Sequence, residues 1–406
     1  MPWAREVSNE DVTVMRFLSS LKLVRAALAA LLLVPFSMNA DSALSKQFLV
    51  YFGTYTGTKS QGIYVSRFDT ASGKLSAPTL AAKSINPAYL AVDPGHRFLF
   101  AANETDHFNG QAGGSVAAFR LDAPAGTLEF LNQQPSGGTS PCHIAVDATG
   151  KYVFVANYSS GSVAVFPVQT NGLIGSPTAV IQHHGSGVNP QRQAGPHAHC
   201  VAMDASHHRV FACDLGLDKV MIYRLNEING ALTADENPWV ELKPGSGPRH
   251  IAFSPDGRRA YVINELGSTL TAFIYEPEQG ALKEIQTVST LPEDFHGKNT
   301  CAEVAVHPSG KFVYGSNRGD DSIAVFAVEE PSGRLDFVER QSTRGKTPRC
   351  FAVDPTGRYL IAANQDSDSI VVFRINAQTG RLTWTGQTVE VGKPVCVVFV
   401  PPETAP

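Results

Sequence analysis

Short apolar runs of strand length, separated by turns rich in Gly and Asp, recur along most of the chain. Three of them lie close together at His143–Asp147, Tyr152–Asn157 and Val163–Phe166, with glycine turns between them. Their residues are mostly β-branched or aromatic, and the apolar positions do not follow the 3.6-residue period of a helix. The pattern predicts a three-stranded meander, to which a Gly-x-Leu step such as Gly280–Leu282 adds a fourth strand.

The meander repeats at intervals of about 50 residues, the length of a four-stranded propeller blade. Its copies start near positions 87, 141, 196, 248, 301 and 348. The ends of the repeat region supply one more copy, because 393–400 has the pattern of a lone first strand and 48–75 that of a blade without one. The sequence therefore predicts an all-β, seven-bladed β-propeller of four-stranded blades over residues 47–401. Its N- and C-terminal strands share one blade, which closes the ring and removes free sheet edges.

Residues 1–40 do not share the repeat and have the pattern of a secretory signal peptide. Basic residues precede the apolar run Ala26–Val34, and small residues follow it. The run is short for a membrane span, and Met15 offers a second start that leaves a signal of ordinary length. We expect residues 41–46 to be a short linker and the mature protein to be periplasmic or secreted, without membrane association after cleavage. An uncleaved anchor is the alternative.

Charge and cysteine content narrow the expected partners and cross-links. The formal net charge is −4, and basic and aromatic residues do not interleave as a nucleic-acid platform requires, so no nucleic-acid partner is expected. Five of the six cysteines fall on predicted first strands, where small apolar side chains pack around the axis. We therefore expect no structural disulfide, and Cys350 with Cys396 is the alternative pair because they occupy equivalent positions of neighbouring blades.

Two sets of positions should meet at one mouth of such a ring. Residues that begin the first strands lie near the axis, and loops after the second strands approach the same mouth. If the repeat had only a structural role, these positions would carry the same small or apolar residues in every blade. Instead, the residues at these positions differ from blade to blade and are largely ionisable. The first set is Tyr89, His143, His197, His199, Arg249, His250, Glu303 and Arg349. The second set is Glu104, Tyr158, Leu215, Glu265, Arg318 and Gln365.

The chain resembles the propeller lactonase family, which contains propeller-type 6-phosphogluconolactonases and related muconate-cyclising enzymes. The resemblance covers about residues 47–400. The motifs that carry it are Arg192-Gln193, Pro196–His199, Pro248–His250, Asn264–Leu266 and Ser316–Arg318. It implies an active centre of one histidine, one glutamate and two arginines. These roles fall on His197 or His199, Arg249, Glu265 and Arg318.

The implied reaction is hydrolysis of a sugar lactone, a small-molecule substrate. It needs a base for water, donors for the carbonyl oxyanion and an acid for the departing alkoxide. We assign His199 or His197 as the base, oriented by Glu265, while Arg249 and Arg318 stabilise the oxyanion or hold an anionic group. The residues expected to bind substrate are Glu104, His143, His250, Glu303 and Arg349. The substrate implied by resemblance is 6-phosphogluconolactone, and predicted export points to unphosphorylated gluconolactone.

No cofactor and no metal are expected. Neither a G-x-S-x-G nor an H-E-x-x-H motif is present, so neither a serine hydrolase nor that class of zinc site is indicated. His197, His199 and Glu303 are the alternative metal ligands, although two histidines beside two arginines make a poor calcium site. Two other functions stay open. One is a muconate-type cycloisomerase with the same residues, and the other is a propeller that binds a partner without catalysis.

Overall fold

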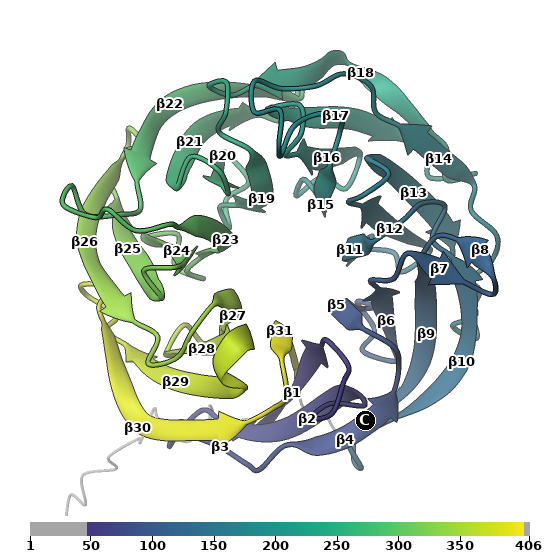
Figure 1. Ribbon diagram of the computed structural model, residues 1–406, viewed down its shortest axis with the longest axis horizontal. Coiled ribbons are helices and arrows are strands. Elements are labelled where there is room, and N and C mark those ends of the chain that lie inside the picture. Colours follow the sequence, from purple (N-terminus) through teal and green to yellow (C-terminus); the bar gives the residue numbers. More distant parts are fainter. Residues whose placement is uncertain (1–46, 402–406) are drawn as a thin grey trace, which may run out of the picture. The chain divides into compact units, whose positions relative to one another are not determined.

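The computed structural model describes residues 47–401, which form a closed ring of seven sheets (Figure 1). Six sheets have four antiparallel strands, and the remaining one has five. This confirms the predicted all-β, seven-bladed propeller. The predicted signal peptide (1–40) and linker (41–46) lie outside the described residues. Within 47–401, no helix has the length and apolar character needed to cross a membrane.

One strand of every blade lies next to the ring's centre, and a second strand pairs with it on its outer side (Figure 1). The innermost strands are β5 (Pro87–Val92), β11 (Pro141–Val146), β15 (Ala198–Met203), β19 (Pro248–Phe253), β23 (Thr300–Val306), β27 (Pro348–Val353) and β31 (Pro394–Val400). The second strands are β1 (Gln47–Thr54), β6 (Phe98–Asn103), β12 (Tyr152–Asn157), β16 (Arg209–Asp214), β20 (Arg259–Asn264), β24 (Phe312–Arg318) and β28 (Tyr359–Asn364).

The outer half of each blade follows the same order. The third strands are β2 (Gly62–Asp69), β9 (Ser115–Asp122), β13 (Ser162–Pro167), β17 (Lys219–Leu225), β21 (Thr269–Glu276), β25 (Ser322–Val328) and β29 (Ser369–Ile375). The outermost strands are β3 (Lys74–Leu75), β4 (Thr79–Lys83), β10 (Thr127–Pro135), β14 (Ala179–Gln182), β18 (Leu232–Glu241), β22 (Ala281–Ser289), β26 (Leu335–Ser342) and β30 (Leu382–Glu390). The remaining elements are the hairpin β7 (His107–Phe108) and β8 (Gln111–Ala112), and the short 3-10 helix η1 (Gln365–Ser367).

The two ends of the described chain close the ring. β31 pairs antiparallel with β1, in a register that joins Leu49 to Val400 and Gly53 to Cys396. The C-terminal segment thus supplies the innermost strand of the blade that begins with β1, as the sequence predicts. With β31 in place, the blade that begins with β1 also has an innermost strand, so all seven blades are complete and the ring is closed.

The hydrophobic core lies between adjacent blades. All six residues of β6, β12, β16 and β28 are buried, because each second strand is covered by a neighbouring sheet on both faces. This explains why the second strands appear in the sequence as continuous apolar runs instead of alternating ones. The six cysteines are buried in this core with free thiols. Cys350 and Cys396, the alternative disulfide pair, are both unbonded.

A β-bulge interrupts the start of every innermost strand. In β19, for example, Pro248 pairs with Asn264 and His250 with Ile263, so Arg249 has no partner across the sheet. A bulge of this kind turns the extra residue out of the regular alternation and re-aims its side chain. The residues that the bulges leave unpaired are Ala88, Cys142, His199, Arg249, Ala302 with Glu303, Arg349 and Val395. Four of the residues predicted at the starts of first strands belong to this set, namely His199, Arg249, Glu303 and Arg349.

Candidate active site

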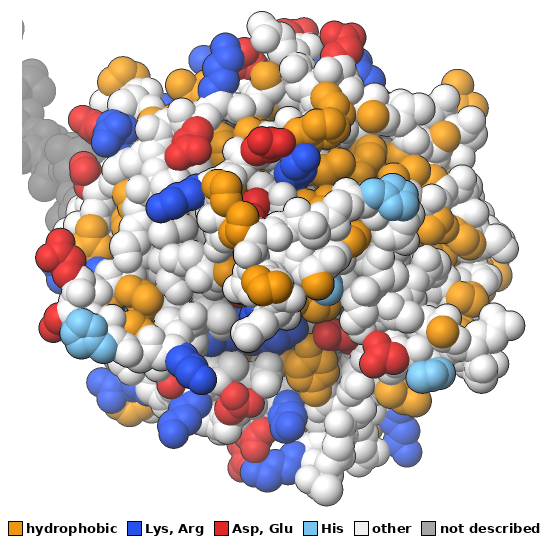
Figure 2. Space-filling model, turned by 45° about the horizontal axis from the view of Figure 1, so that its top comes forward, with side chains coloured by type: hydrophobic (Ala, Val, Ile, Leu, Met, Phe, Trp, Pro, Cys, Tyr) orange, Lys and Arg blue, Asp and Glu red, His pale blue; other side chains and the backbone are white. Residues whose placement is uncertain are grey.

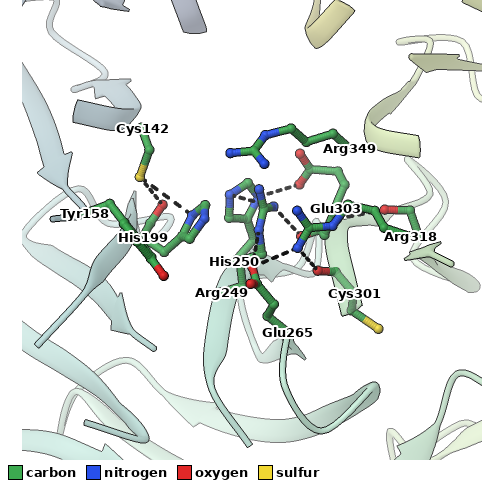
Figure 3. A network of polar contacts seen from close by, with 12 residues as sticks. Cys142, Tyr158, His199, Arg249, His250, Glu265, Cys301, Glu303, Arg318 and Arg349 are labelled. Carbon is green, nitrogen blue, oxygen red and sulfur yellow. Dashed lines mark hydrogen bonds and ion pairs between the residues drawn. The ribbon is translucent and has the colours of Figure 1, made fainter. Parts of the chain in front are cut away.

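A cavity of about 320 Å³ opens where the bulges and the loops after the second strands meet. It is lined by Glu104, Cys142, Tyr158, Arg192, His199, Glu265, Thr300, Arg318 and Arg349. Figure 2 shows basic side chains in a depression near the centre of one face, and Figure 3 shows the residues around the cavity from close by. The cavity brings together side chains of six blades and of the loop between β14 and β15.

Glu265 is the centre of a cluster of three guanidinium groups. Its Oε1 lies 2.6 Å from Arg192 Nη2, and its Oε2 lies 2.9 Å from Arg318 Nη2 and 3.1 Å from Arg249 Nε. Burial alone would raise the pKa of Glu265, but Arg318, Arg249 and Arg192 together lower it to about 2. The carboxylate is therefore ionised at neutral pH. Among residues 47–401 the partners of this carboxylate are arginines, so Glu265 does not orient a histidine by direct contact, contrary to the expected role.

Arg249 lies behind the cavity wall, with 2% of its surface exposed. It donates from Nη1 to the Ala302 carbonyl at 2.6 Å and lies 3.2 Å from His250 Nε2. Because a guanidinium only donates, His250 Nε2 accepts, and His250 Nδ1–H donates to Glu303 Oε1 at 2.8 Å. Burial raises the pKa of Glu303, whose Oε2 has no hydrogen-bond partner within the described chain. Arg249, His250 and Glu303 thus form a layer beneath the cavity (Figure 3).

The structure separates the two candidate histidines. His199 is buried and lines the cavity, and its Nδ1 lies 3.7 Å from Cys142 Sγ. Burial, with Arg249 adding to it, lowers the pKa of His199 well below its usual value, so the imidazole is neutral. His197 instead stacks on Tyr158 with ring centroids 4.5 Å apart, and its Nδ1 lies 3.0 Å from the Tyr158 carbonyl oxygen. His197 therefore supports the cavity wall from outside.

The opposite wall carries Glu104, Tyr55 and Arg349. The Tyr55 hydroxyl donates to Glu104 Oε2 at 2.7 Å, and Arg349 Nη2 lies 4.0 Å from the same oxygen. The guanidinium of Arg349 also lies 5.4 Å from the centre of the Tyr55 ring. Burial tends to lower the pKa of Arg349, but Tyr55 and Glu104 raise it above its usual value, so the group stays charged. The wall therefore offers both a cation and a carboxylate to a ligand.

Arg192 reaches the cavity because two buried side chains anchor the loop before β15. His183 Nδ1–H donates to Asp214 Oδ2 at 2.6 Å, and the Tyr223 hydroxyl donates to His183 Nε2 at 2.8 Å. Gln193, beside Arg192, is fully buried and donates to the Leu215 carbonyl at 2.9 Å. These anchors fix the polar insert on both sides of the segment that carries Arg192.

The predicted site residues fall into three groups. Glu104, His199, Glu265, Arg318 and Arg349 line the cavity. Arg249, His250 and Glu303 lie in the layer beneath it. His143 and His197 do not line it, since His143 stacks on Tyr89 with centroids 4.0 Å apart and His197 stacks on Tyr158.

Sequence reasoning assigned no catalytic or binding role to Cys142, Tyr158, Arg192 or Thr300, although it placed Tyr158 at the mouth. Two of them carried a usable signal, because Arg192 stands in a motif and Tyr158 follows a second-strand Asn. Cys142 occupies the bulge position of its blade that His199 and Arg249 occupy in theirs, which only the strand register reveals. Among residues 47–401, no group of three or more His, Cys, Asp or Glu side chains has an arrangement that could hold a metal ion. The alternative ligand set of His197, His199 and Glu303 is therefore not assembled, because Glu303 pairs with His250.

Comparisons with known proteins find relatives over most of the chain. Residues 49–399 match the family model described as lactonase, 7-bladed beta-propeller. The chain is 44% identical to a 6-phosphogluconolactonase of Bacillus subtilis over 87% of this chain and 99% of that protein. It is 34% identical to a 6-phosphogluconolactonase of Formosa agariphila over 75% of this chain and 85% of the relative. The structure of a periplasmic gluconolactonase of Pseudomonas aeruginosa superposes with a TM-score of 0.83 at 39% identity, covering 88% of this chain and 100% of that one. The chain belongs to the family of seven-bladed β-propeller lactonases.

Proposed function

We propose that this protein hydrolyses the ring ester of a sugar lactone to the open aldonic acid, without a cofactor. The observation that carries the proposal is a single cavity in which a neutral, buried imidazole faces several guanidinium groups. Membership of the lactonase family supports the same reaction. The proposed site uses His199 with Arg318 and Arg192 in the reaction, Glu265 and Arg249 to hold these groups in place, and His197 to support the wall through Tyr158.

The proposed base is His199. Its Nε2 takes a proton from a water molecule as the water oxygen attacks the lactone carbonyl carbon. Negative charge then develops on the carbonyl oxygen, and guanidinium donors of Arg318 and Arg192 stabilise it. When the tetrahedral intermediate collapses, the bond to the ring oxygen breaks and the imidazolium returns its proton to that oxygen. The sum is one water consumed and one hydroxy acid formed.

The remaining charged groups have supporting roles in this proposal. Glu265 holds three arginines in place, and Arg249 links that cluster to the His250–Glu303 layer. Arg349 and Glu104 are proposed to bind the hydroxyl or anionic groups of the sugar. Three guanidinium groups line the cavity and a fourth, that of Arg249, lies behind its wall, against the two carboxyl groups of Glu104 and Glu265, so the cavity favours an anionic group on the substrate or product.

A hydrolysis screen tests the proposal. Purified protein is mixed with 6-phosphogluconolactone, with gluconolactone and with a muconate-type lactone, and ring opening is followed against the spontaneous rate. We expect enzyme-dependent opening of at least one sugar lactone. Opening of either one would support the proposal, because one relative is named as a 6-phosphogluconolactonase and another as a gluconolactonase. Turnover of the muconate-type compound alone would favour the cycloisomerase, and no turnover of any lactone would favour a binding propeller.

The pH dependence of kcat/KM gives a second test. Because burial and Arg249 lower the pKa of His199 below 6.5, its neutral base form persists as the pH falls past the usual histidine range. We expect activity to be constant through pH 6.5 and to decline only at lower pH, where the imidazole takes a proton. An acid limb at or above pH 6.5 would contradict His199 as the base in this environment.

We further propose that the protein is exported to the periplasm or beyond. Support comes from the signal-like pattern of residues 1–40 and from the relative that is named as periplasmic. Fractionation of cells that express the full chain, followed by N-terminal sequencing of the mature protein, distinguishes cleavage from an uncleaved anchor.

A further inference from the structure

Cys142 shares its structural position with the proposed base. It is the unpaired residue of the β11 bulge, as His199 is of the β15 bulge in the next blade. It is buried, lines the same cavity, and places Sγ 3.7 Å from His199 Nδ1 (Figure 3). The proposed mechanism of hydrolysis does not use this thiol.

The surroundings of Cys142 determine which partner donates. Its Sγ lies 3.4 Å from the His199 carbonyl oxygen, 3.7 Å from that of Ala198 and 3.8 Å from that of Ala156. Carbonyl oxygens only accept, so the single thiol hydrogen is directed to them, most closely to His199 O. The sulfur lone pairs are then left to accept a hydrogen bond from His199 Nδ1–H.

We propose that Cys142 is a positioning residue that fixes His199 in the Nδ1–H tautomer, leaving Nε2 as the bare nitrogen that takes the proton from water. His199 Nε2 has no hydrogen-bond partner among residues 47–401, which agrees with a nitrogen that is free for a ligand. The role is the one that a carboxylate or carbonyl has for many catalytic histidines. It replaces the orienting role that the sequence assigned to Glu265. The inference rests on the proposed function, because it assumes that His199 is the base.

Burial raises the pKa of the Cys142 thiol well above its usual value, which agrees with this role. A protonated thiol keeps the hydrogen that the neighbouring carbonyls accept. It is also a poor nucleophile, so formation of a thioester with the substrate is disfavoured. The thiol therefore acts through His199 and not on the lactone.

Kinetics of three variants test the proposal. Cys142→Ala removes the acceptor, and we expect kcat to fall by about tenfold or more. Its acid limb should also move to lower pH, because the sulfur no longer stabilises the imidazolium. Cys142→Ser keeps an atom that both donates to carbonyls and accepts from Nδ1–H, so it should restore most of the lost activity. Cys213→Ala is the matched control, because Cys213 is another fully buried thiol, in the blade β15–β18. Its kcat and pH profile should equal those of the wild type.

A spectroscopic measurement separates this inference from the proposed function. In protein labelled with ¹⁵N-histidine, long-range ¹H–¹⁵N spectra report which ring nitrogen carries the proton, and His199→Gln identifies the signal. We expect Nδ1–H in the wild type and in Cys142→Ser, and a mixture of tautomers in Cys142→Ala. An Nε2–H wild type, or an alanine variant with unchanged tautomer and kinetics, would overturn the inference. Absence of lactone hydrolysis by the wild type would instead overturn the function, while the tautomer could still be read.

Discussion

Asparagine in place of His199 is expected to lower kcat for lactone hydrolysis by about 10²–10⁴-fold, the usual contribution of a general base. Arginines are always protonated, and Glu265 has a pKa of about 2, so neither type of group can replace the imidazole as a base near neutral pH. Asparagine keeps a polar side chain that fits beside Cys142 but cannot exchange the proton. The measurement is steady-state hydrolysis with the lactone that the wild type opens fastest.

His208→Asn is the matched control. His208 belongs to the same blade but lies exposed in a turn, where its Nδ1 contacts Glu227. The same chemical change there should leave kcat and KM unaltered. If His199→Asn kept more than about a tenth of the wild-type kcat with an intact fold, the proton would have to go elsewhere and the proposed mechanism would be wrong.

Glu265→Ala is expected to affect both the fold and the reaction. Glu265 is 5% exposed and its carboxylate pairs with three guanidinium groups, of which that of Arg249, 2% exposed, is also buried. Loss of one member of a buried ion pair costs about 3–5 kcal/mol of unfolding free energy, since the remaining charges stay without compensation. Hydrolysis should fall by about a hundredfold or more, because Arg192 and Arg318 lose their fixed positions. Urea unfolding and steady-state kinetics measure the two effects.

Glu241→Ala provides the comparison for Glu265→Ala. Glu241 pairs with Lys219 at 3.3 Å on the surface, where such a pair contributes about 0–1 kcal/mol. A loss of stability for Glu265→Ala no larger than for Glu241→Ala would show that Glu265 does not organise the cluster.

The contribution of Glu265 to the free energy of unfolding depends on pH with a definite sign, because the folded-state pKa of Glu265 is lowered from 4.5 to about 2. Its stabilisation is present above the ordinary glutamate pKa and is lost as the pH falls toward 2.

The architecture was predictable because each blade is a complete signal in itself. Four short strands with glycine turns recur often enough that errors in one copy are corrected by the others. The shared blade was also predictable. The run at 393–400 has the pattern of a first strand without the other three, and the strands that begin at Gln47 lack a first strand, so the two segments complete one blade. The strand pattern within each blade and the closing of the ring by the terminal strands thus lead to the same fold, and this consistency makes the repeat sequence interpretable.

The site was predictable in position but not in detail. Sequence alone could not separate His197 from His199, because residues two apart in a regular strand point to the same side. The bulge breaks that rule in β15, and Asp214 accepts the backbone N–H of His197 at 2.8 Å, so only His199 lines the cavity. The role of Glu265 was missed for another reason. Three arginines from separate segments meet it, and no single-segment pattern contains that information.

The bulges also bear on how new specificities arise in this architecture. A residue that pairs with nothing across the sheet can be exchanged without disturbing the ladder beside it. Ala88 and Val395 hold this position in two adjoining blades and carry no polar group. At this strand position the two blades add no polar side chain, whereas the other five blades carry Cys142, His199, Arg249, Glu303 and Arg349 there. We therefore expect exchanges at these seven positions to change the chemistry of the site while the strand pairing that builds the ring stays in place.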